Sequence, residues 1–527
     1  MARQTQSFET WHIGALEQLF RQTKLFSWTL TAKSSNKQIS GYPDNWRGFA
    51  ENGLSMMTSG SGWRTDGCKF QKFDWLRDLR SFGGSDSRGR ARTLIKNWID
   101  KNSRWHPYSW RPDIMGTRVA NLVFCYDWYG SSADDNFQKK LSTSIKLQAR
   151  CLALDWRRLK RAEDRVTAFK GLFIAESALD TKPEELSILL GFLIPLIENI
   201  VHPDGGHKDR MPDLHLMVLR DLMDIRNAYP VTNLKQKKWL DITISKMAAV
   251  CRLWRHADGQ FARFNGAGRV HTNLIEETLV RSGQKGKVVN LAPDTGFVRI
   301  SSGRSTVVMD VGEPVKNASI TGLGTLGFEF SVGQSLLIIN PGQTAKEKNF
   351  QRLLQSTNAH STLTIDGYNS TDFDSNRIAT IKQVEIGPAK GGYRATADHS
   401  GYQNSHGIIH RRTLYLANSG GNLRGLDHME YTGAPGEIGR LASIRFHLHP
   451  WVTAAMLRDH RILIKIRGNR SGWLFRTNGT AVLDSSLFFN SVGRMNCQQI
   501  VVTMPINNIR TVGTIEVKWA FQRDVQQ

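Results

Sequence analysis

The chain of 527 residues lacks long hydrophobic runs and has few cysteines. Its longest apolar run, Leu186 to Ile197, is interrupted by Pro195 and is short for a membrane span, so we expect no transmembrane helix. The five cysteines are odd in number and form no C-x-x-C pair, which argues against a disulfide framework and a thiolate zinc site. The first forty residues show no export signal, and taken alone they indicate a cytoplasmic protein.

Acidic side chains are outnumbered by basic ones. Lys and Arg total 70 against 47 Asp and Glu, which gives a formal net charge of +23. Such a surface attracts polyanions, and nucleic acid, an anionic membrane and an acidic polysaccharide all fit; a basic surface that serves only solubility is the plain alternative. The sequence contains no helix-turn-helix, zinc-finger or aromatic RNA-binding signature, so we expect no nucleic-acid partner.

The first half of the chain has the hydrophobic period of helices. Apolar residues recur at helical spacing in five segments, which are 140–157, 165–179, 185–201, 214–228 and 237–254. These helix hairpins follow one another in series, as in a structural repeat.

After about residue 287 the pattern changes to short, β-branched or alternating segments separated by Gly, Asn and Ser turns. The expected strands lie within 297–311, 326–340, 360–366, 411–416, 461–467 and 472–476. Runs of helices followed by runs of strands predict separate α and β domains. With a seam at Gly283–Gly286, the predicted domains are 1–285 and 286–527.

Seven strings carry a resemblance to a known family: FDWLRDLRSFGG (73–84), WHPYSWRPDIMGTRVAN (105–121), HPDGGHKDRMP (202–212), DGQFARFNGAG (258–268), LGFEFSVGQSLLIINPG (326–342), STNAHSTLTIDG (356–367) and RFHLHP (445–450). In this order they resemble the heparinase II/III-like family. The resemblance implies an incomplete α/α toroid followed by an antiparallel β-sandwich. It also implies a polysaccharide lyase of uronic-acid-containing chains in the cell envelope or periplasm.

β-Elimination needs a group that neutralises the uronate carboxylate, a base that takes the neighbouring proton, and an acid that protonates the leaving oxygen. Similar lyases carry a neutralising Asn in the stretch that corresponds to 161–165, where this chain has Glu163 and Asp164 instead, and Glu163 is our candidate for a substrate contact at that position. A carboxylate there would repel a uronate, whereas Arg165 could neutralise it bidentately. The plain alternative is a solvated helix start.

The segment 202–215 is rich in ionisable side chains beside Gly205 and Gly206. Similar proteins often have a catalytic Tyr here, and this chain has none. His207 is therefore our candidate base, with His215 as second choice, and Arg210 is a candidate for binding the substrate carboxylate. A helix-entry turn with surface charges is the alternative interpretation.

Aromatic and polar side chains elsewhere are candidates for substrate binding: Trp105, Trp110 and Arg111 for sugar subsites, and Asn265 as a substrate contact or a buried loop residue. His360 matches a family position that can bind zinc, and we also count it among the substrate-binding candidates. The expected partner histidine is missing from 321–325, and neutral Asn340 is a poor ligand. We therefore predict no metal, and nothing in the sequence indicates a cofactor.

The predicted function is a polysaccharide lyase acting on an acidic glycan. Two alternatives stay open: an altered family member that only binds acidic envelope glycans, and a glycoside hydrolase that uses paired carboxylates on the same architecture. Because a polymer substrate would lie outside the cytoplasm, the resemblance favours the cell envelope or periplasm over the cytoplasm. The oligomeric state is not predicted.

Overall fold

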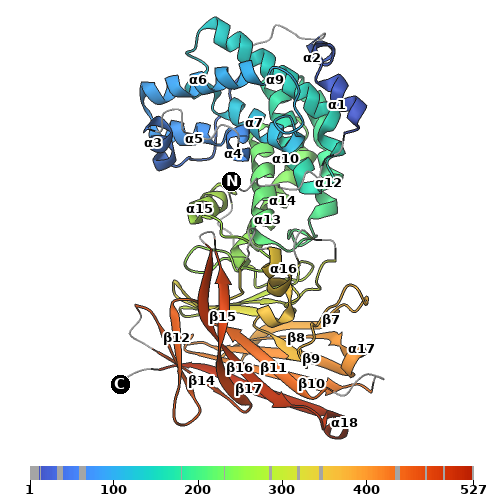
Figure 1. The fold of residues 1–527 in the computed structure, drawn as a ribbon, viewed down its shortest axis with the longest axis vertical. Coiled ribbons are helices and arrows are strands. Elements are labelled where there is room, and N and C mark those ends of the chain that lie inside the picture. Colours follow the sequence, from blue (N-terminus) through green and yellow to red (C-terminus); the bar gives the residue numbers. More distant parts are fainter. Residues whose placement is uncertain are drawn as a thin grey trace. The chain divides into compact units, whose positions relative to one another are not determined.

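The computed structural model describes all residues except 1–10, 12, 32–38, 59–66, 180, 231, 284–287, 317, 319–320, 343–347, 434–438, 469–471, 491–492 and 525–527. The chain forms two compact units. The first contains residues 1–200 and 217–244, and the second contains 201–216 and 245–527. Helices come first along the chain and antiparallel strands follow (Figure 1).

The helices before the first strand are α1 (Ala15–Arg21), α2 (Lys24–Thr31), α3 (Ala50–Thr58), α4 (Cys68–Lys72), α5 (Trp75–Phe82), α6 (Gly84–Lys101), α7 (Pro112–Phe124), α8 (Tyr126–Tyr129), α9 (Asp135–Asp155), the 3-10 turn η2 (Trp156–Arg158), α10 (Ala162–Ala178), α11 (Pro183–Gly191), α12 (Leu193–Ile200), α13 (Pro212–Ala228), α14 (Leu234–Trp254) and α15 (Thr272–Arg281). In the part of the chain that the structure describes, no helix is long and apolar enough to cross a membrane.

Local sequence explains several helix ends. The Asp134 side chain accepts a hydrogen bond from the Phe137 backbone N–H and caps α9. The segment 185–201, expected as one helix, is two helices that meet at Phe192. Pro195 is the reason, because it has no N–H to donate to the carbonyl of Gly191, where α11 ends.

Two glycines bring α7 and α10 into close contact. A Cβ atom added to Gly171 would lie 2.2 Å from the Cα atom of Gly116, and one added to Gly116 would lie 2.6 Å from the Thr167 carbonyl oxygen. No side chain fits between the two backbones at this crossing. The approach places the first turns of α7 and α10, which carry Asp113 and Asp164, near one another.

The strands are β1 (Leu291–Ala292), β2 (Phe297–Ser302), β3 (Ser305–Asp310), β4 (Phe328–Val332), β5 (Ser335–Ile338), β6 (Leu363–Ile365), β7 (Ile381–Ala389), β8 (Gly392–Tyr402), β9 (Ile408–Ala417), β10 (Asn422–Tyr431), β11 (Leu441–His447), β12 (Val452–Met456), β13 (Ile462–Ile466), β14 (Trp473–Thr477), β15 (Thr480–Phe489), β16 (Arg494–Pro505) and β17 (Thr514–Arg523). They form sheets of five, eight and four strands, in the orders β1-β2-β3-β4-β5, β12-β13-β14-β17-β10-β9-β8-β7 and β15-β16-β11-β6.

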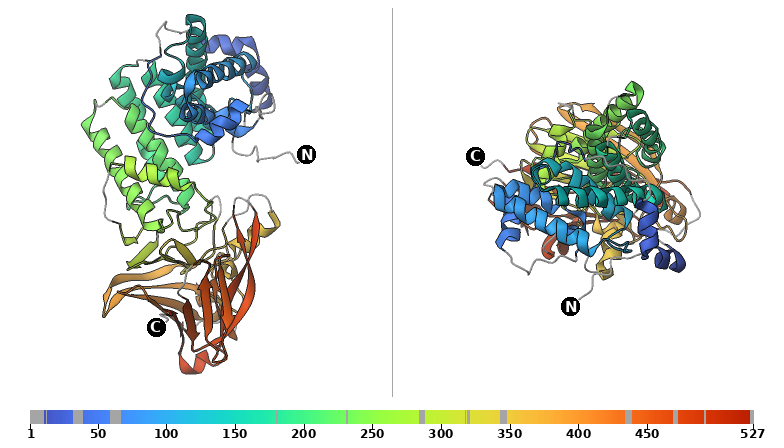
Figure 2. Two further views of the ribbon diagram at one scale, coloured as in Figure 1. Left: turned by 90° about the vertical axis from the view of Figure 1, so that its left-hand side faces the viewer. Right: turned by 90° about the horizontal axis from the view of Figure 1, so that it is seen from above.

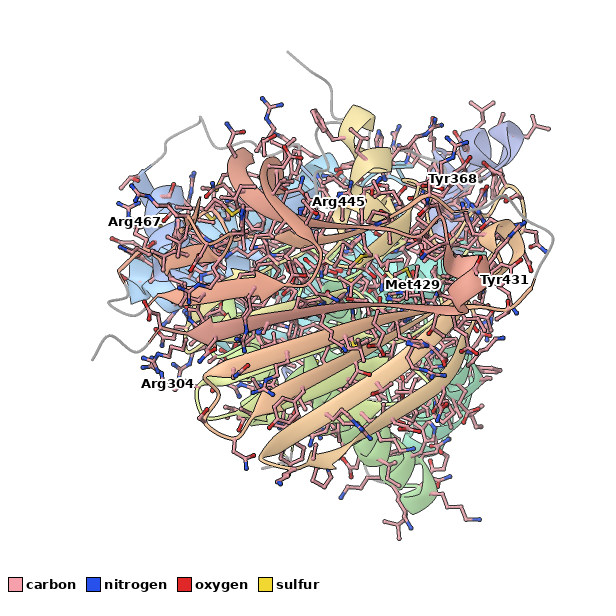
Figure 3. All side chains as sticks on the ribbon, turned by 90° about the horizontal axis from the view of Figure 1, so that it is seen from below. Arg304, Tyr368, Met429, Tyr431, Arg445 and Arg467 are labelled. Atoms are coloured by element: carbon pink, nitrogen blue, oxygen red, sulfur yellow. The ribbon has the colours of Figure 1, made fainter. Side chains whose placement is uncertain are left out.

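The sheets of the second unit stack as layers around one apolar core (Figure 2). Side chains on β9 alternate between buried and half-buried positions along the whole strand, as the two-residue period of a strand facing a core requires. Met429 of β10 is buried in this core, whereas Arg304 and Arg467 are exposed at its margin (Figure 3).

The helix-then-strand prediction is confirmed, with small exceptions. Four short helical segments lie among the strands: α16 (Lys348–Gln355), η3 (Thr357–Ala359), α17 (Gln403–His406) and α18 (Ile509–Val512). The predicted boundary at 285/286 lies outside the described residues, between the end of α15 and the start of β1. Since α15 and the end of α14 group with the strands in the second unit, the domain limits 1–285 and 286–527 stay a prediction.

Candidate active site

A cluster of polar side chains gathers at the first turns of α7 and α10 in the first unit. It consists of Tyr108, Arg111, Asp113, Arg161 and Asp164, which we call the α7–α10 cluster. Arg111 precedes α7 and donates from Nε and Nη2 to the two carboxylate oxygens of Asp113, at 2.5 and 2.6 Å. This bidentate pair fixes the guanidinium beside the helix start.

Asp164 is the titratable centre of the α7–α10 cluster. Burial and the nearby Asp113 carboxylate raise the pKa of Asp164 to about 6, although Arg161 and Arg111 act in the opposite direction. The side chain is half-buried, so solvent and ligands can reach it. A carboxyl group that titrates near neutral pH can both accept and release a proton.

Tyr108 adds a proton donor to the same cluster. Its side chain is half-buried, and burial together with the neighbouring Cys68 thiol raises the pKa of the phenol. The phenol therefore keeps its proton at neutral pH. The sequence prediction expected a catalytic tyrosine within 202–215, and the aromatic-basic string 105–111 is the signal that points to Tyr108 instead.

The other predicted residues of the first unit have internal partners. Glu163 is buried, and its carboxylate lies 3.5 Å from Arg161. Arg165 donates from Nε to the Leu159 carbonyl oxygen at 2.5 Å. This bond holds the guanidinium against the preceding turn. It therefore opposes the predicted role of Arg165, which was to bind a uronate carboxylate bidentately.

Trp105 and Trp110 are not placed to stack against sugars, which corrects the sequence prediction. Their side chains are only 2% and 4% exposed. Trp105 packs against Trp11 with ring centroids 5.8 Å apart, and the Arg21 guanidinium lies 5.7 Å from its ring. Both indoles therefore belong to the packed interior of the helical unit.

In the second unit, a tight turn after α12 carries His207. The His202 N–H donates to the Gly206 carbonyl, and Gly205 has a positive φ of 100°. The turn after α14 repeats this arrangement: the His256 N–H donates to the Gln260 carbonyl, and Gly259 has φ 84°.

The aspartates of these two turns also match. Asp204 and Asp258 each accept a hydrogen bond from the N–H two residues further on, at 3.0 and 2.9 Å. The strings H-P-D-G-G-H and H-A-D-G-Q-F therefore form one recurring turn, in line with the expected repetition of helix hairpins.

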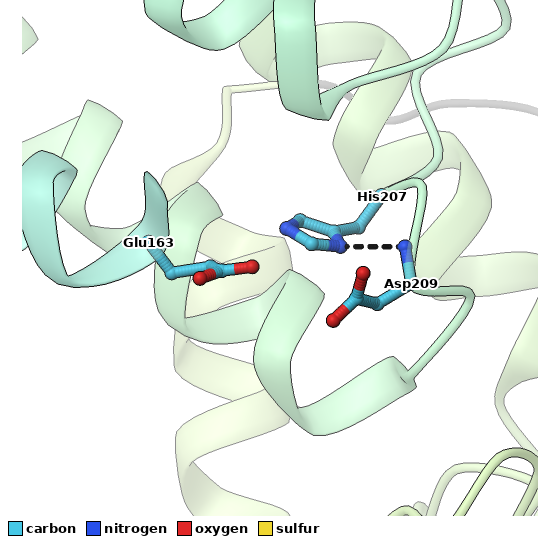
Figure 4. Close-up of side chains that lie close together, drawn as sticks. All are labelled: Glu163, His207 and Asp209. Carbon is cyan, nitrogen blue, oxygen red and sulfur yellow. Dashed lines mark hydrogen bonds between the residues drawn. The ribbon is translucent and has the colours of Figure 1, made fainter. Parts of the chain in front are cut away.

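His207 is only 1% exposed, and its hydrogen bonds oppose the predicted role of a base. Its Nδ1 atom accepts a hydrogen bond from the Asp209 N–H at 3.0 Å (Figure 4). The neutral ring then carries its proton on Nε2. This tautomer presents an N–H donor at Nε2, and its one lone pair, on Nδ1, already accepts the hydrogen bond from the backbone.

His215 is a structural histidine rather than a base. Its Nδ1 atom accepts from the His207 N–H at 3.2 Å, and Nε2 donates to the Met247 carbonyl oxygen at 2.9 Å. The side chain is fully buried against Trp254, and burial lowers its pKa to about 3. Both ring nitrogens are therefore committed to the backbone.

Arg210 is buried and cannot serve a substrate carboxylate as predicted. It forms an ion pair with Asp310 and donates to three backbone carbonyls, those of Thr295, Gly296 and Glu313. Its guanidinium also lies 4.9 Å from the Phe297 ring centroid. These bonds hold the loop after α12 against β2 and β3.

Asn265 and His360 are also internal. Asn265 donates from Nδ2 to the Arg210 carbonyl at 3.1 Å and accepts from the Gly322 N–H at 3.2 Å, in a positive-φ conformation of 52°. His360 is 5% exposed, too buried to contact a polymer, and burial lowers its pKa to about 3. Of the two uses predicted for Asn265, the structure therefore shows the buried loop residue.

The surroundings of His360 do not fit zinc. Its Nδ1 atom lies 2.9 Å from the amide oxygen of Asn340, a neutral and weak ligand. The nearby Glu329 carboxylate already accepts hydrogen bonds from two backbone N–H groups and lies 3.2 Å from His256 Nε2.

Helices followed by stacked antiparallel sheets form an architecture that this chain shares with solved heparinases. Residues 284–520 match the family model described as "Heparinase II/III-like, C-terminal". This part of the chain is therefore a heparinase II/III-like C-terminal domain, and the resemblance found in the sequence is confirmed.

The whole described chain has the fold of solved heparinases. A mutant of the heparan sulfate lyase HepC from Pedobacter heparinus superposes with a TM-score of 0.67 at 14% identity, covering 96% of this chain and 88% of the other. A heparinase III crystal structure gives a TM-score of 0.67 at 12% identity, covering 98% and 93%. The predicted toroid-plus-sandwich fold class is thus confirmed.

A relative with higher sequence identity is the FtsZ-localized protein C of Caulobacter vibrioides. It is 27% identical over 432 residues, which are 78% of this chain and 74% of that protein.

Proposed function

We propose that this protein binds an acidic, uronic-acid-containing polysaccharide and cleaves it by β-elimination at the α7–α10 cluster. The observation that carries the proposal is the meeting of Asp164 with Arg111, Arg161 and Tyr108 at the ends of two tightly packed helices. The heparinase fold and the +23 net charge both favour a polyanionic substrate.

Each step of the elimination has a candidate group in the α7–α10 cluster. The Asp164 carboxylate, with a pKa of about 6, takes the proton beside the uronate carboxylate. The Arg161 side chain is 40% exposed and neutralises the negative charge that grows on the substrate carboxylate, while Arg111 stays paired with Asp113. The Tyr108 phenol, protonated at neutral pH, donates to the leaving oxygen. Trp105 and Trp110 are buried and have no part in this proposal.

The test is an assay of the full chain against a panel of acidic polysaccharides, following the ultraviolet absorbance of the new double bond. Asp164→Asn should lower the rate about a hundred- to ten-thousand-fold. The control is Asp135→Asn, which changes an exposed carboxylate on α9 and should leave the rate unchanged. New reducing ends without the absorbance would show a glycoside hydrolase, and binding without any product would show the altered, non-catalytic member.

A second candidate function rests on the Caulobacter relative. Its name states localisation with FtsZ, and its identity to this chain is about twice that of the heparinase structures. We propose that this protein also localises with FtsZ in its own cell. Fluorescent fusions of the two proteins should overlap, and a fusion distributed evenly through the cell would contradict this.

A further inference from the structure

The two helices α1 and α2 expose a dense set of large apolar side chains. Within thirteen positions, five such residues have 47–85% of their surface exposed: Leu16, Leu19, Phe20, Leu25 and Trp28. Single exposed apolar residues are ordinary, whereas five on two helices that pack against each other are typical of a contact surface. Both helices lie in the first unit, and α2 packs against α9 (Figure 1).

The opposite side of α1 and α2 is firmly held. Arg21 is buried, donates to both carboxylate oxygens of Asp155 at 2.5 and 2.8 Å, and pairs with Glu17 at 2.7 Å. Phe26 and Leu30 are also buried. The helices are thus anchored by one face, and the exposure of the other face follows from that anchoring.

Basic side chains border the apolar group. Arg158 binds Glu17 at 2.5 Å, which places the end of α9 beside α1. Arg157 and Lys160 are exposed in the same segment, and Lys24 is exposed at the start of α2. Leu154 in the last turn of α9 is 57% exposed.

We propose that this α1–α2 surface docks the protein onto an anionic lipid membrane. The apolar side chains would enter the boundary between head groups and acyl chains, and the cations would lie against the lipid phosphates. Charge is the argument for a lipid occupant: exposed aliphatic and indole side chains lie in a segment with exposed Lys and Arg, on a chain of net charge +23, and this combination is typical of interfacial membrane binding. Trp28 suits the membrane interface because its ring is apolar and its N–H is polar. The inference is independent of the proposed function.

The experiment is sedimentation of the full chain with lipid vesicles. Vesicles of phosphatidylglycerol and phosphatidylcholine should bind the protein, and vesicles of phosphatidylcholine alone should bind it much more weakly. The double variant Leu19→Glu/Trp28→Glu should lower the apparent affinity about tenfold or more, because each charged carboxylate opposes both insertion and attraction. The matched control is Ile188→Glu combined with Leu234→Glu, which places the same two charges at residues of α11 and α14 that are 67% and 75% exposed.

Circular dichroism of each variant is the control for correct folding. The proposal is overturned if the wild-type chain does not sediment with anionic vesicles, or if the double variant and the Ile188→Glu/Leu234→Glu control bind equally well. Gel filtration tests a different occupant, a second copy of the chain. If the wild-type protein self-associates, the double variant is monomeric and neither protein binds vesicles, then the surface is an interface between copies. In that case the membrane proposal fails.

Discussion

Arg210 and Asp310, one hundred residues apart in the chain, form an ion pair that is buried on both sides. Burial raises the pKa of Asp310, and Arg210 acts against that rise. The pair ties the turn that carries His207 to the strand β3 within the second unit. An arginine that looks in sequence like a substrate-binding residue is therefore part of the framework.

Arg210→Ala should destabilise the protein, because it leaves the Asp310 carboxylate buried without its cation. We expect the free energy of unfolding to fall by about 3–5 kcal/mol. Chemical denaturation followed by tryptophan fluorescence measures this. Arg467→Ala, at an exposed loop position, is the control and should change little. If Arg210→Ala kept full stability but lost substrate affinity, Arg210 would be a substrate-binding residue and its structural assignment would be wrong.

Asp164→Asn should raise the free energy of unfolding at neutral pH while it lowers the rate about a hundred- to ten-thousand-fold. A carboxyl group whose pKa is raised to about 6 in the folded state favours folding when protonated. That contribution is fully present below its ordinary pKa of 3.8 and is lost as the pH rises through 6. The neutral amide of Asn does not suffer this loss. Melting temperatures of both proteins from pH 4 to 8 should therefore diverge as the pH rises, and parallel curves would contradict the assignment.

Acid should weaken the second unit through its buried histidines. Burial lowers the pKa of His215 to about 3, and that of His447 to about 4. Since the unfolded histidines take up protons near pH 6.5, stability is full above that value and falls as the pH drops toward 4, by up to about 1.4 kcal/mol per pH unit for each residue. His215→Gln should flatten this dependence in denaturation curves at pH 7, 6 and 5.

Met456→Gln provides the control for that measurement, because it introduces the same amide at a residue of β12 that is 41% exposed and does not titrate, and it should leave the pH dependence unchanged. If His215 were instead a catalytic base, its substitution would remove activity without altering the slope of stability against pH.

Gly116→Ala should disturb the α7–α10 cluster from a distance. The new methyl group would lie 2.7 Å from the Ala168 Cα atom, so the two helices must separate. We expect a loss of about 1–3 kcal/mol in the free energy of unfolding and lower activity, since Asp164 and Arg111 are positioned by this crossing. Gly89→Ala in α6 is the matched control: nothing lies within 4 Å of its new methyl group, and it should stabilise the helix by about 0.5–1 kcal/mol. Equal effects of the two substitutions would contradict the role of the crossing.

Sequence periodicity predicted the order of helices and strands because each element buries one face. The long strands β8 and β10 were nevertheless missed. Their buried positions include residues such as Gly425 and His399, which carry no strand signal. Gly425 is there because the Trp519 ring lies against it: a Cβ atom would come within 2.0 Å of the indole. Cross-strand packing of this kind cannot be seen in a single segment.

The candidate site was harder to predict, because residue type says little about burial. Arg210, His215 and Asn265 have the chemistry of an active site, and in the structure their polar groups bind backbone atoms. Asp164 was taken as an obstacle to substrate binding. Its usefulness depends on a pKa that burial and the Asp113 carboxylate, fifty-one positions earlier, raise at a helix crossing that the sequence does not reveal.

The recurring turn after α12 and α14 has an evolutionary consequence. Its backbone is specified by the aspartate and the glycine, and the position that follows holds His207 in one copy and Phe261 in the other. One architecture thus accepts a titratable ring or an apolar one at the same point. At such a position a single substitution can add or remove a titratable side chain while the backbone of the turn stays the same.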